Sequence, residues 1–114
     1  MGLLSKKPDD DQAVFDEYAD SMLLWCQRVN QAREARAGDG TPSAIIQTAG
    51  QRPTLNIERL ASRTDRDSAI SAARAWVRME ADKLARQDVL RGRSADFWSQ
   101  IGEYLYSDLP QPSY

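Results

Sequence analysis

The chain has 114 residues, 41 % of them hydrophobic, and its 15 Lys and Arg against 17 Asp and Glu give a net charge of −2. This length suits one domain, and the balanced composition argues against intrinsic disorder. The sequence has no His and a single Cys, which excludes intrachain disulfides and removes the commonest general base and most zinc ligand sets. We therefore expect no catalytic residue, no cofactor and no bound metal.

Residues 1–8 contain only a two-leucine apolar run, much shorter than the hydrophobic segment of a secretion signal. No stretch of the sequence approaches the ~18 consecutive apolar residues that a membrane span requires. These features predict a cytoplasmic protein without membrane attachment. We expect a single helical domain over residues 9–109, between a flexible N-terminus at residues 1–8 and a flexible tail at residues 110–114.

From residue 8 to about residue 36, apolar residues recur at spacings of three and four, which predicts a long amphipathic helix. Its apolar stripe consists of Phe15, Tyr18, Met22, Trp25, Val29 and Ala32. The acidic run Asp9–Asp11 is expected in the first turn, where carboxylates interact favourably with the helix dipole. Gly38 is expected as the C-terminal cap.

Residues 38–62 are interrupted by Gly and Pro, and this pattern predicts a long irregular connector. Residues 44–48 could form a strand, but the sequence offers no second strand to pair with it. Because structureless loops of more than about 12–15 residues are uncommon, we expect a helical turn or two over residues 56–61. That turn would place Ile57 and Leu60 on the core.

A second long helix is predicted from Thr64, as its N-cap, to Leu90, ending before Gly92. Its apolar face contains Ala69, Ile70, Ala73, Trp76, Val77 and Leu84. A third, shorter helix is expected between Ser94 and Pro110, and it carries Phe97, Trp98, Ile101, Tyr104 and Leu105.

The predicted fold class is therefore all-α. We expect the two long amphipathic helices to form an antiparallel hairpin, and the short C-terminal helix to complete a three-helix, bundle-like arrangement. Three helices bury only a modest core, so part of an apolar stripe can be completed by a second copy of the chain.

Glu80 interrupts the apolar face of the second long helix. One interpretation places it at the edge of that face, with its carboxylate in water or paired with an arginine. The other has Glu80 meet an arginine across an interface between chains and fix the register of that interface.

Six arginines follow the second long helix: Arg63, Arg66, Arg74 and Arg78 on one side, with Arg91 and Arg93 just beyond its end. A basic stripe of this kind can bind a phosphate backbone. However, Asp67, Asp82 and Asp88 lie on the same side, and the sequence pI is about 5.1. The mixed charge favours a solvated face or a face that pairs with another protein.

The first helix has an acidic face of Asp16, Glu17, Asp20 and Glu34, with Leu24 among them. This face could meet the arginines of a second copy. The aromatic third helix is a candidate docking groove, although core packing explains the same residues: Phe97, Trp98, Tyr104 and Tyr106. Cys26 beside Trp25 is expected to be a small buried hydrophobe, since no His is present to activate a thiol.

These observations predict a non-catalytic protein–protein interaction or assembly module, an adaptor or accessory subunit that self-associates as a homodimer. The candidate partner-binding residues are Glu80, Arg74, Arg78, Phe97, Trp98, Tyr104 and Leu24. The alternative is a nucleic-acid accessory protein of a bacterium, phage or plasmid that uses the six arginines. A carboxylate enzyme is a minor third alternative.

Overall fold

The computed structural model describes residues 10–35 and 40–113, and every regular element in these ranges is helical. The elements are α1 (Asp11–Glu34), α2 (Pro42–Ala49), the 3-10 helix η1 (Ile57–Arg59), α3 (Arg63–Leu90) and α4 (Asp96–Asp108). The all-α prediction is confirmed. The predicted flexible N-terminus at residues 1–8, Asp9 and the predicted cap Gly38 lie outside the described residues.

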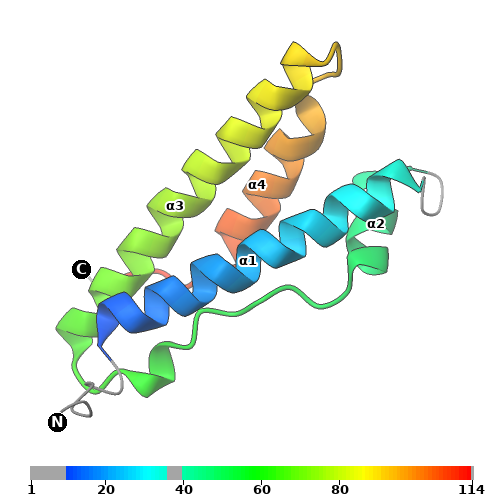
Figure 1. Cartoon of the computed structure of the whole chain (residues 1–114). Coiled ribbons are helices and arrows are strands. Elements are labelled where there is room, and N and C mark those ends of the chain that lie inside the picture. The colour runs from blue at the N-terminus through cyan, green and yellow to red at the C-terminus, as the bar shows by residue number, and fades with distance from the viewer. Residues whose placement is uncertain (1–9, 36–39, 114) are drawn as a thin grey trace, which may run out of the picture.

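The long helices α1 and α3 run in the same direction (Figure 1). The ring centroids of Phe15, near the start of α1, and Trp76, in the middle of α3, are 6.5 Å apart, and Arg33, near the end of α1, forms a 2.8 Å ion pair with Asp88, near the end of α3. The predicted antiparallel hairpin of the two long helices is therefore wrong. The reason is that residues 50–62 run back along α1, so α3 begins beside the N-terminal end of α1 (Figure 1).

The antiparallel partner of α3 is α4. Arg74, early in α3, bonds Tyr106, late in α4, whereas Ala81 faces Gly102. A Cβ on Gly102 would lie 2.5 Å from the Ala81 Cβ, so this glycine permits the close approach of the two helices. The two form a helical hairpin that packs on α1.

The short helix α2 replaces part of the irregular connector that the sequence predicts. Thr41 caps it by accepting a hydrogen bond from the Ala44 N–H at 3.3 Å, and Pro42 occupies its first turn. Gly50, at φ +94°, ends it. The predicted irregular conformation is therefore wrong for residues 42–49. The reason is that Pro and Gly, which interrupt a helix from within, are favoured at its first turn and just after its end.

Two side chains of α1 hold the end of α2 in place. Trp25 Nε1 donates to the Gly50 carbonyl and Arg28 Nε donates to the Ala49 carbonyl, both at 3.1 Å. These carbonyls have no partner within their own helix, so the bonds fix α2 against α1. Further along, the predicted helical turn is confirmed by η1, with Leu60 buried and Ile57 half-buried.

The ends of α3 are defined by local hydrogen bonds. Ser62 is the N-cap and accepts from the Asp65 N–H at 3.0 Å, so the helix begins slightly before the predicted Thr64. At the other end the Gly92 N–H donates to Val89 O at 3.0 Å and the Arg93 N–H to Asp88 O at 2.8 Å, with Gly92 at φ +78°. This is a Schellman motif, and it confirms the predicted stop.

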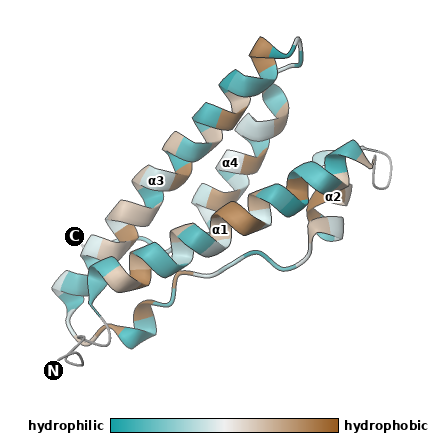
Figure 2. Cartoon of the chain, in the orientation of Figure 1, coloured by the Kyte–Doolittle hydropathy of each residue, from teal (hydrophilic) through white to brown (hydrophobic). Residues whose placement is uncertain are grey.

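The core contains most of the predicted apolar stripes. Buried in it are Tyr18, Met22, Trp25, Val29 and Ala32 of α1, Ala69, Ile70, Ala73 and Val77 of α3, and Trp98, Ile101 and Leu105 of α4. Phe15, Trp76 and Leu84 are half-buried against the core. In Figure 2 the hydrophobic residues of α1 alternate with hydrophilic ones along the helix.

The segment after α4, for which we predict flexibility, lies along α3. Arg74 Nη1 donates to the Pro110 carbonyl at 3.3 Å, and the Ser113 N–H donates to Asp67 Oδ1 at 2.9 Å. None of the described helices combines the length and apolar character needed to cross a lipid bilayer.

Candidate functional site

The side of α3 opposite its buried residues carries large apolar side chains in solvent. Exposed residues follow this side at spacings of three and four, and we call them the outer face of α3: Ala72, Ala75, Met79, Asp82, Arg86 and Val89. Met79 is 67 % exposed and Val89 is 56 % exposed. Exposed apolar groups aligned along one helix face are characteristic of contact surfaces.

A groove adjoins the outer face at the C-terminal end of α3. It has a volume of about 440 Å³ and lies between the end of α3 and the start of α4, lined by Asp82, Ala85, Arg86, Val89, Leu90, Ala95 and Ser99. Leu90 is 86 % exposed, and the end of α3 is coloured as hydrophobic in Figure 2. The outer face and this groove form one continuous surface, because they share Asp82, Arg86 and Val89.

An ion pair lies in the middle of the outer face. Arg86 Nε is 2.8 Å from Asp82 Oδ2, one helical turn away, and both side chains are exposed. Along the helix the order is therefore apolar Met79, acidic Asp82, basic Arg86 and apolar Val89.

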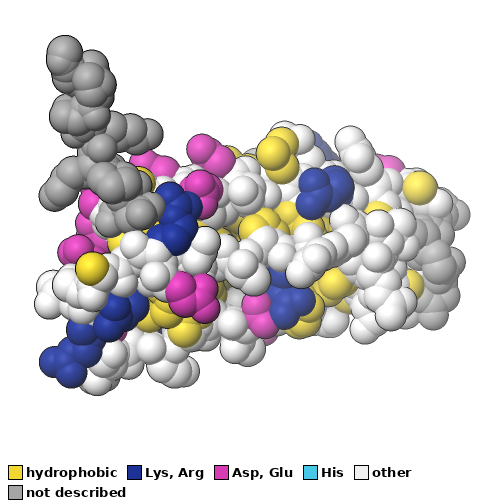
Figure 3. Space-filling model, turned by 90° about the horizontal axis from the view of Figure 1, so that it is seen from below, with side chains coloured by type: hydrophobic (Ala, Val, Ile, Leu, Met, Phe, Trp, Pro, Cys, Tyr) yellow, Lys and Arg dark blue, Asp and Glu magenta, His cyan; other side chains and the backbone are white. Residues whose placement is uncertain are grey.

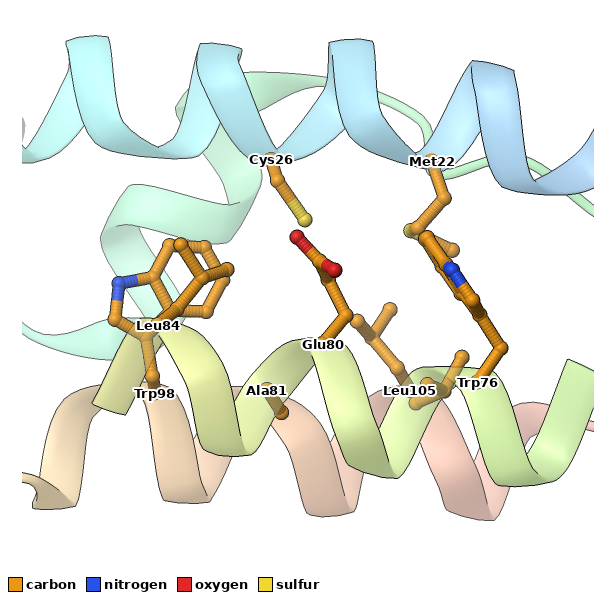
Figure 4. A pocket seen from close by; sticks show the side chains of 9 residues that line it. Met22, Cys26, Trp76, Glu80, Ala81, Leu84, Trp98 and Leu105 are labelled. Atoms are coloured by element: carbon orange, nitrogen blue, oxygen red, sulfur yellow. The ribbon is translucent and has the colours of Figure 1, made fainter. Parts of the chain in front are cut away.

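Glu80 points inward, to the space between α1 and α3 (Figure 4). Its carboxylate is directed toward Cys26, its side chain is only 15 % exposed, and Lys83 Nζ lies 3.3 Å from Oε2. The cavity beside it measures about 10 Å³, enough for one water molecule at most. Glu80 thus lies within the fold, and its partner there is a lysine of the same helix.

Cys26 is buried against the same cavity. Burial raises the pKa of the Cys26 thiol to about 12, and the negative charge of Glu80 adds to the effect. The thiol is therefore protonated at neutral pH, which makes it a poor nucleophile. This agrees with the expected role of a small buried hydrophobe.

Arg74 and Arg78, candidates for both partner binding and phosphate binding, converge on Tyr106. Arg74 Nη2 donates to the Tyr106 hydroxyl at 2.9 Å, and the Arg78 guanidinium lies 3.8 Å from the centre of the Tyr106 ring. These contacts fasten α4 to α3.

The other predicted arginines divide into two groups. Arg66 Nη1 donates to the Leu60 carbonyl at 2.9 Å, and Arg93 pairs with Glu34 at 3.1 Å. Arg63 and Arg91 are exposed at opposite ends of α3, separated by roughly 42 Å for 28 residues of helix. The six arginines therefore do not form a continuous basic surface.

The acidic face of α1 is also partly used within the chain. Glu17 pairs with Arg59 at 2.6 Å, Glu34 pairs with Arg93, and Asp16 accepts a hydrogen bond from Gln12. Leu24 remains 57 % exposed. In Figure 3 acidic, basic and hydrophobic side chains are interspersed over the face seen from below.

The aromatic residues of α4 have different environments. Trp98 is buried, and Phe97 is half-buried beneath the Arg33 guanidinium, 4.0 Å from its ring centre. Tyr104 is exposed, lies under the Arg52 guanidinium and lines a groove of about 340 Å³ between α2 and α4. Only Tyr104 of the three is placed to contact another molecule.

No family model, curated protein or solved structure matches this chain. Among residues 10–35 and 40–113, no three His, Cys, Asp or Glu side chains are close enough together to hold a metal ion.

Sequence reasoning missed Met79, Val89 and Leu90. Their signal was present: Met79, Asp82, Arg86 and Val89 repeat at spacings of three and four, as the core residues do, but about half a turn away around the helix. The alanine and charged residues between them make this repeat difficult to recognise in the sequence.

Proposed function

We propose that this chain is a cytoplasmic, non-catalytic protein–protein interaction module. Its docking surface is the outer face of α3 together with the adjoining groove at the end of α3 and α4. The observation that carries the proposal is the exposure of Met79, Val89 and Leu90, at 67, 56 and 86 %, on one surface. Removing apolar surface from water contributes roughly 25 cal/mol per Å², so covering these side chains favours association.

The surroundings of the chemically reactive groups support a non-catalytic role. Cys26 is buried with its thiol protonated, and Glu80 beside it is paired with Lys83 next to a cavity of about 10 Å³. A substrate would need a larger concave site with several convergent polar groups.

In the first test the full-length chain is immobilised and incubated either with an extract of the native host or with its own untagged copy. The measurement is which proteins the immobilised chain retains. Val89→Lys places a charge on the docking surface, and Leu24→Lys is the matched control because Leu24 is 57 % exposed on α1. We expect Val89→Lys to lose partners that the wild type and Leu24→Lys retain. Equal retention by all three proteins would contradict the proposed surface.

The second test addresses nucleic acid, the alternative function. Because Arg66, Arg74, Arg78 and Arg93 have partners within the chain, we expect no binding of random-sequence duplex or single strands at about 0.15 M salt. Tight binding that weakens steeply with added salt would favour the nucleic-acid function.

A further inference from the structure

The outer face of α3 is complementary to itself, and we propose that its partner is a second copy of this chain. This inference rests on the proposed function and specifies the partner. In the proposed homodimer two α3 helices pack antiparallel through their outer faces, about a twofold axis at the level of Leu84.

The spacing of the exposed residues supports helix-to-helix packing. Ala72, Ala75, Met79, Asp82, Arg86 and Val89 occupy the alternating three- and four-residue positions that form the seam of a coiled coil. All six are exposed, and the helix buries its core residues on the other side. The seam is therefore available to a second helix without rearrangement of the core.

The order of side chains selects one direction and one register. With the axis at Leu84, Met79 lies opposite Val89 of the second copy, and Asp82 lies opposite Arg86 of the second copy. Each carboxylate then meets a guanidinium and each apolar side chain meets another. A parallel arrangement in register would instead oppose Asp82 to Asp82 and Arg86 to Arg86, which is unfavourable.

Neighbouring side chains are compatible with this arrangement. Lys83, which flanks the seam near the axis, is 3.3 Å from Glu80 of its own helix, so its charge is partly neutralised. Leu90 and the groove against α4 continue the apolar surface at each end of the seam. With the axis at Leu84 the overlap covers only residues 78–90 of α3, about 18 Å of helix, so of the outer face only Met79, Asp82, Arg86 and Val89 make the contact, while Ala72 and Ala75 lie outside it. We therefore expect a weak and concentration-dependent dimer.

Disulfide trapping tests the register directly. Met79→Cys and Val89→Cys are combined in the full chain; within one chain these positions are roughly 15 Å apart, too far to be joined. We expect the double variant to form a covalent dimer under mild oxidation, and each single variant to remain monomeric on a non-reducing gel. A covalent dimer of either single variant, or none of the double variant, would overturn the proposed register.

Charge exchange tests the central pair. In sedimentation velocity, Asp82→Arg and Arg86→Asp should each weaken the dimer by about tenfold or more, because each opposes like charges at two places. The exchange variant D82R/R86D restores opposite charges and should dimerise within about threefold of the wild type. If the exchange variant stays as weak as the single variants, the proposed pairing is wrong.

The failure of this inference can be distinguished from the failure of the proposed function. A wild-type chain that stays monomeric at ~1 mM overturns the homodimer. If such a monomer still retains a host protein that Val89→Lys loses, the interaction function stands with a different partner. A monomer that retains nothing overturns both.

Discussion

Arg33 Nη1 donates to Asp88 Oδ2 at 2.8 Å and joins the C-terminal halves of α1 and α3. Asp88 is almost wholly buried, and the Arg33 guanidinium also lies over the Phe97 ring. The pair therefore links α1, α3 and the first turn of α4, and it is possible only because α1 and α3 run in the same direction.

Arg33→Ala should lower the free energy of unfolding by about 3 kcal/mol, because it leaves the buried Asp88 carboxylate without its cation. The matched control is Arg93→Ala, which removes an exposed pair with Glu34 and should change stability by less than about 1 kcal/mol. Urea denaturation measures both. Equal effects of the two substitutions would show that the buried pair is not formed.

Gly102→Ala should destabilise the protein by about 1–3 kcal/mol despite the higher helix propensity of alanine. The reason is steric, since the new Cβ would lie 2.5 Å from the Ala81 Cβ. Ala81→Gly in the same chain removes that clash. The double variant should therefore recover part of the loss, and a neutral or stabilising Gly102→Ala would contradict the close approach of α3 and α4.

Stability should fall as the pH rises above about 9. Burial raises the pKa of the Cys26 thiol in the folded chain to about 12, from an ordinary value of 9.0. The unfolded state therefore loses this proton first and gains stability relative to the folded state. Burial also raises the pKa of Tyr18. The contribution of the buried, protonated Cys26 thiol to the free energy of unfolding is fully present below pH 9 and is lost as the pH rises toward 12.

Cys26→Ala provides the control for that pH dependence. Urea denaturation of this variant between pH 8 and pH 10 should show a shallower loss of stability with pH than that of the wild type. The smaller side chain lowers stability equally at each pH, so it does not change this slope. The same slope in both proteins would mean that the Cys26 thiol is not buried as described.

Glu80→Leu should keep or raise the stability of the chain, because replacing a largely buried charge by an apolar group of similar volume is often neutral or stabilising. The Glu80 side chain is 15 % exposed and faces α1 of its own chain, so the oligomeric state should not change. Thermal melting and sedimentation measure the two effects. Loss of association would support the interpretation in which Glu80 fixes an interface.

Hydrophobic periodicity was sufficient to predict the long helices and most of their core residues. Trp25, Val77 and Ile101 lie on the predicted faces and are buried. Periodicity defines which side of a helix is buried, but it carries no information on the direction of a neighbouring helix. The direction of α3 depends on the return path of residues 50–62, and the sequence offers no short-range signal for it.

The candidate site was less accessible to sequence reasoning. Arg74 and Arg78 look like a solvent-facing basic stripe, but Tyr106, on another helix, engages both. Glu80 interrupts the apolar face of its helix in the sequence, yet its inward direction depends on the position of α1 (Figure 4). The contacts that decide these roles join residues far apart in the sequence, so a local pattern cannot reveal them.

The most direct test of the account is the molar mass of the full-length wild-type chain, measured by light scattering over a range of concentrations. The monomer is 12.8 kDa. We predict a mass that rises with concentration toward twice this value for the wild type and for Leu24→Lys, and that stays at the monomer mass for Val89→Lys. A wild-type mass of 12.8 kDa at every concentration would contradict association through the outer face of α3.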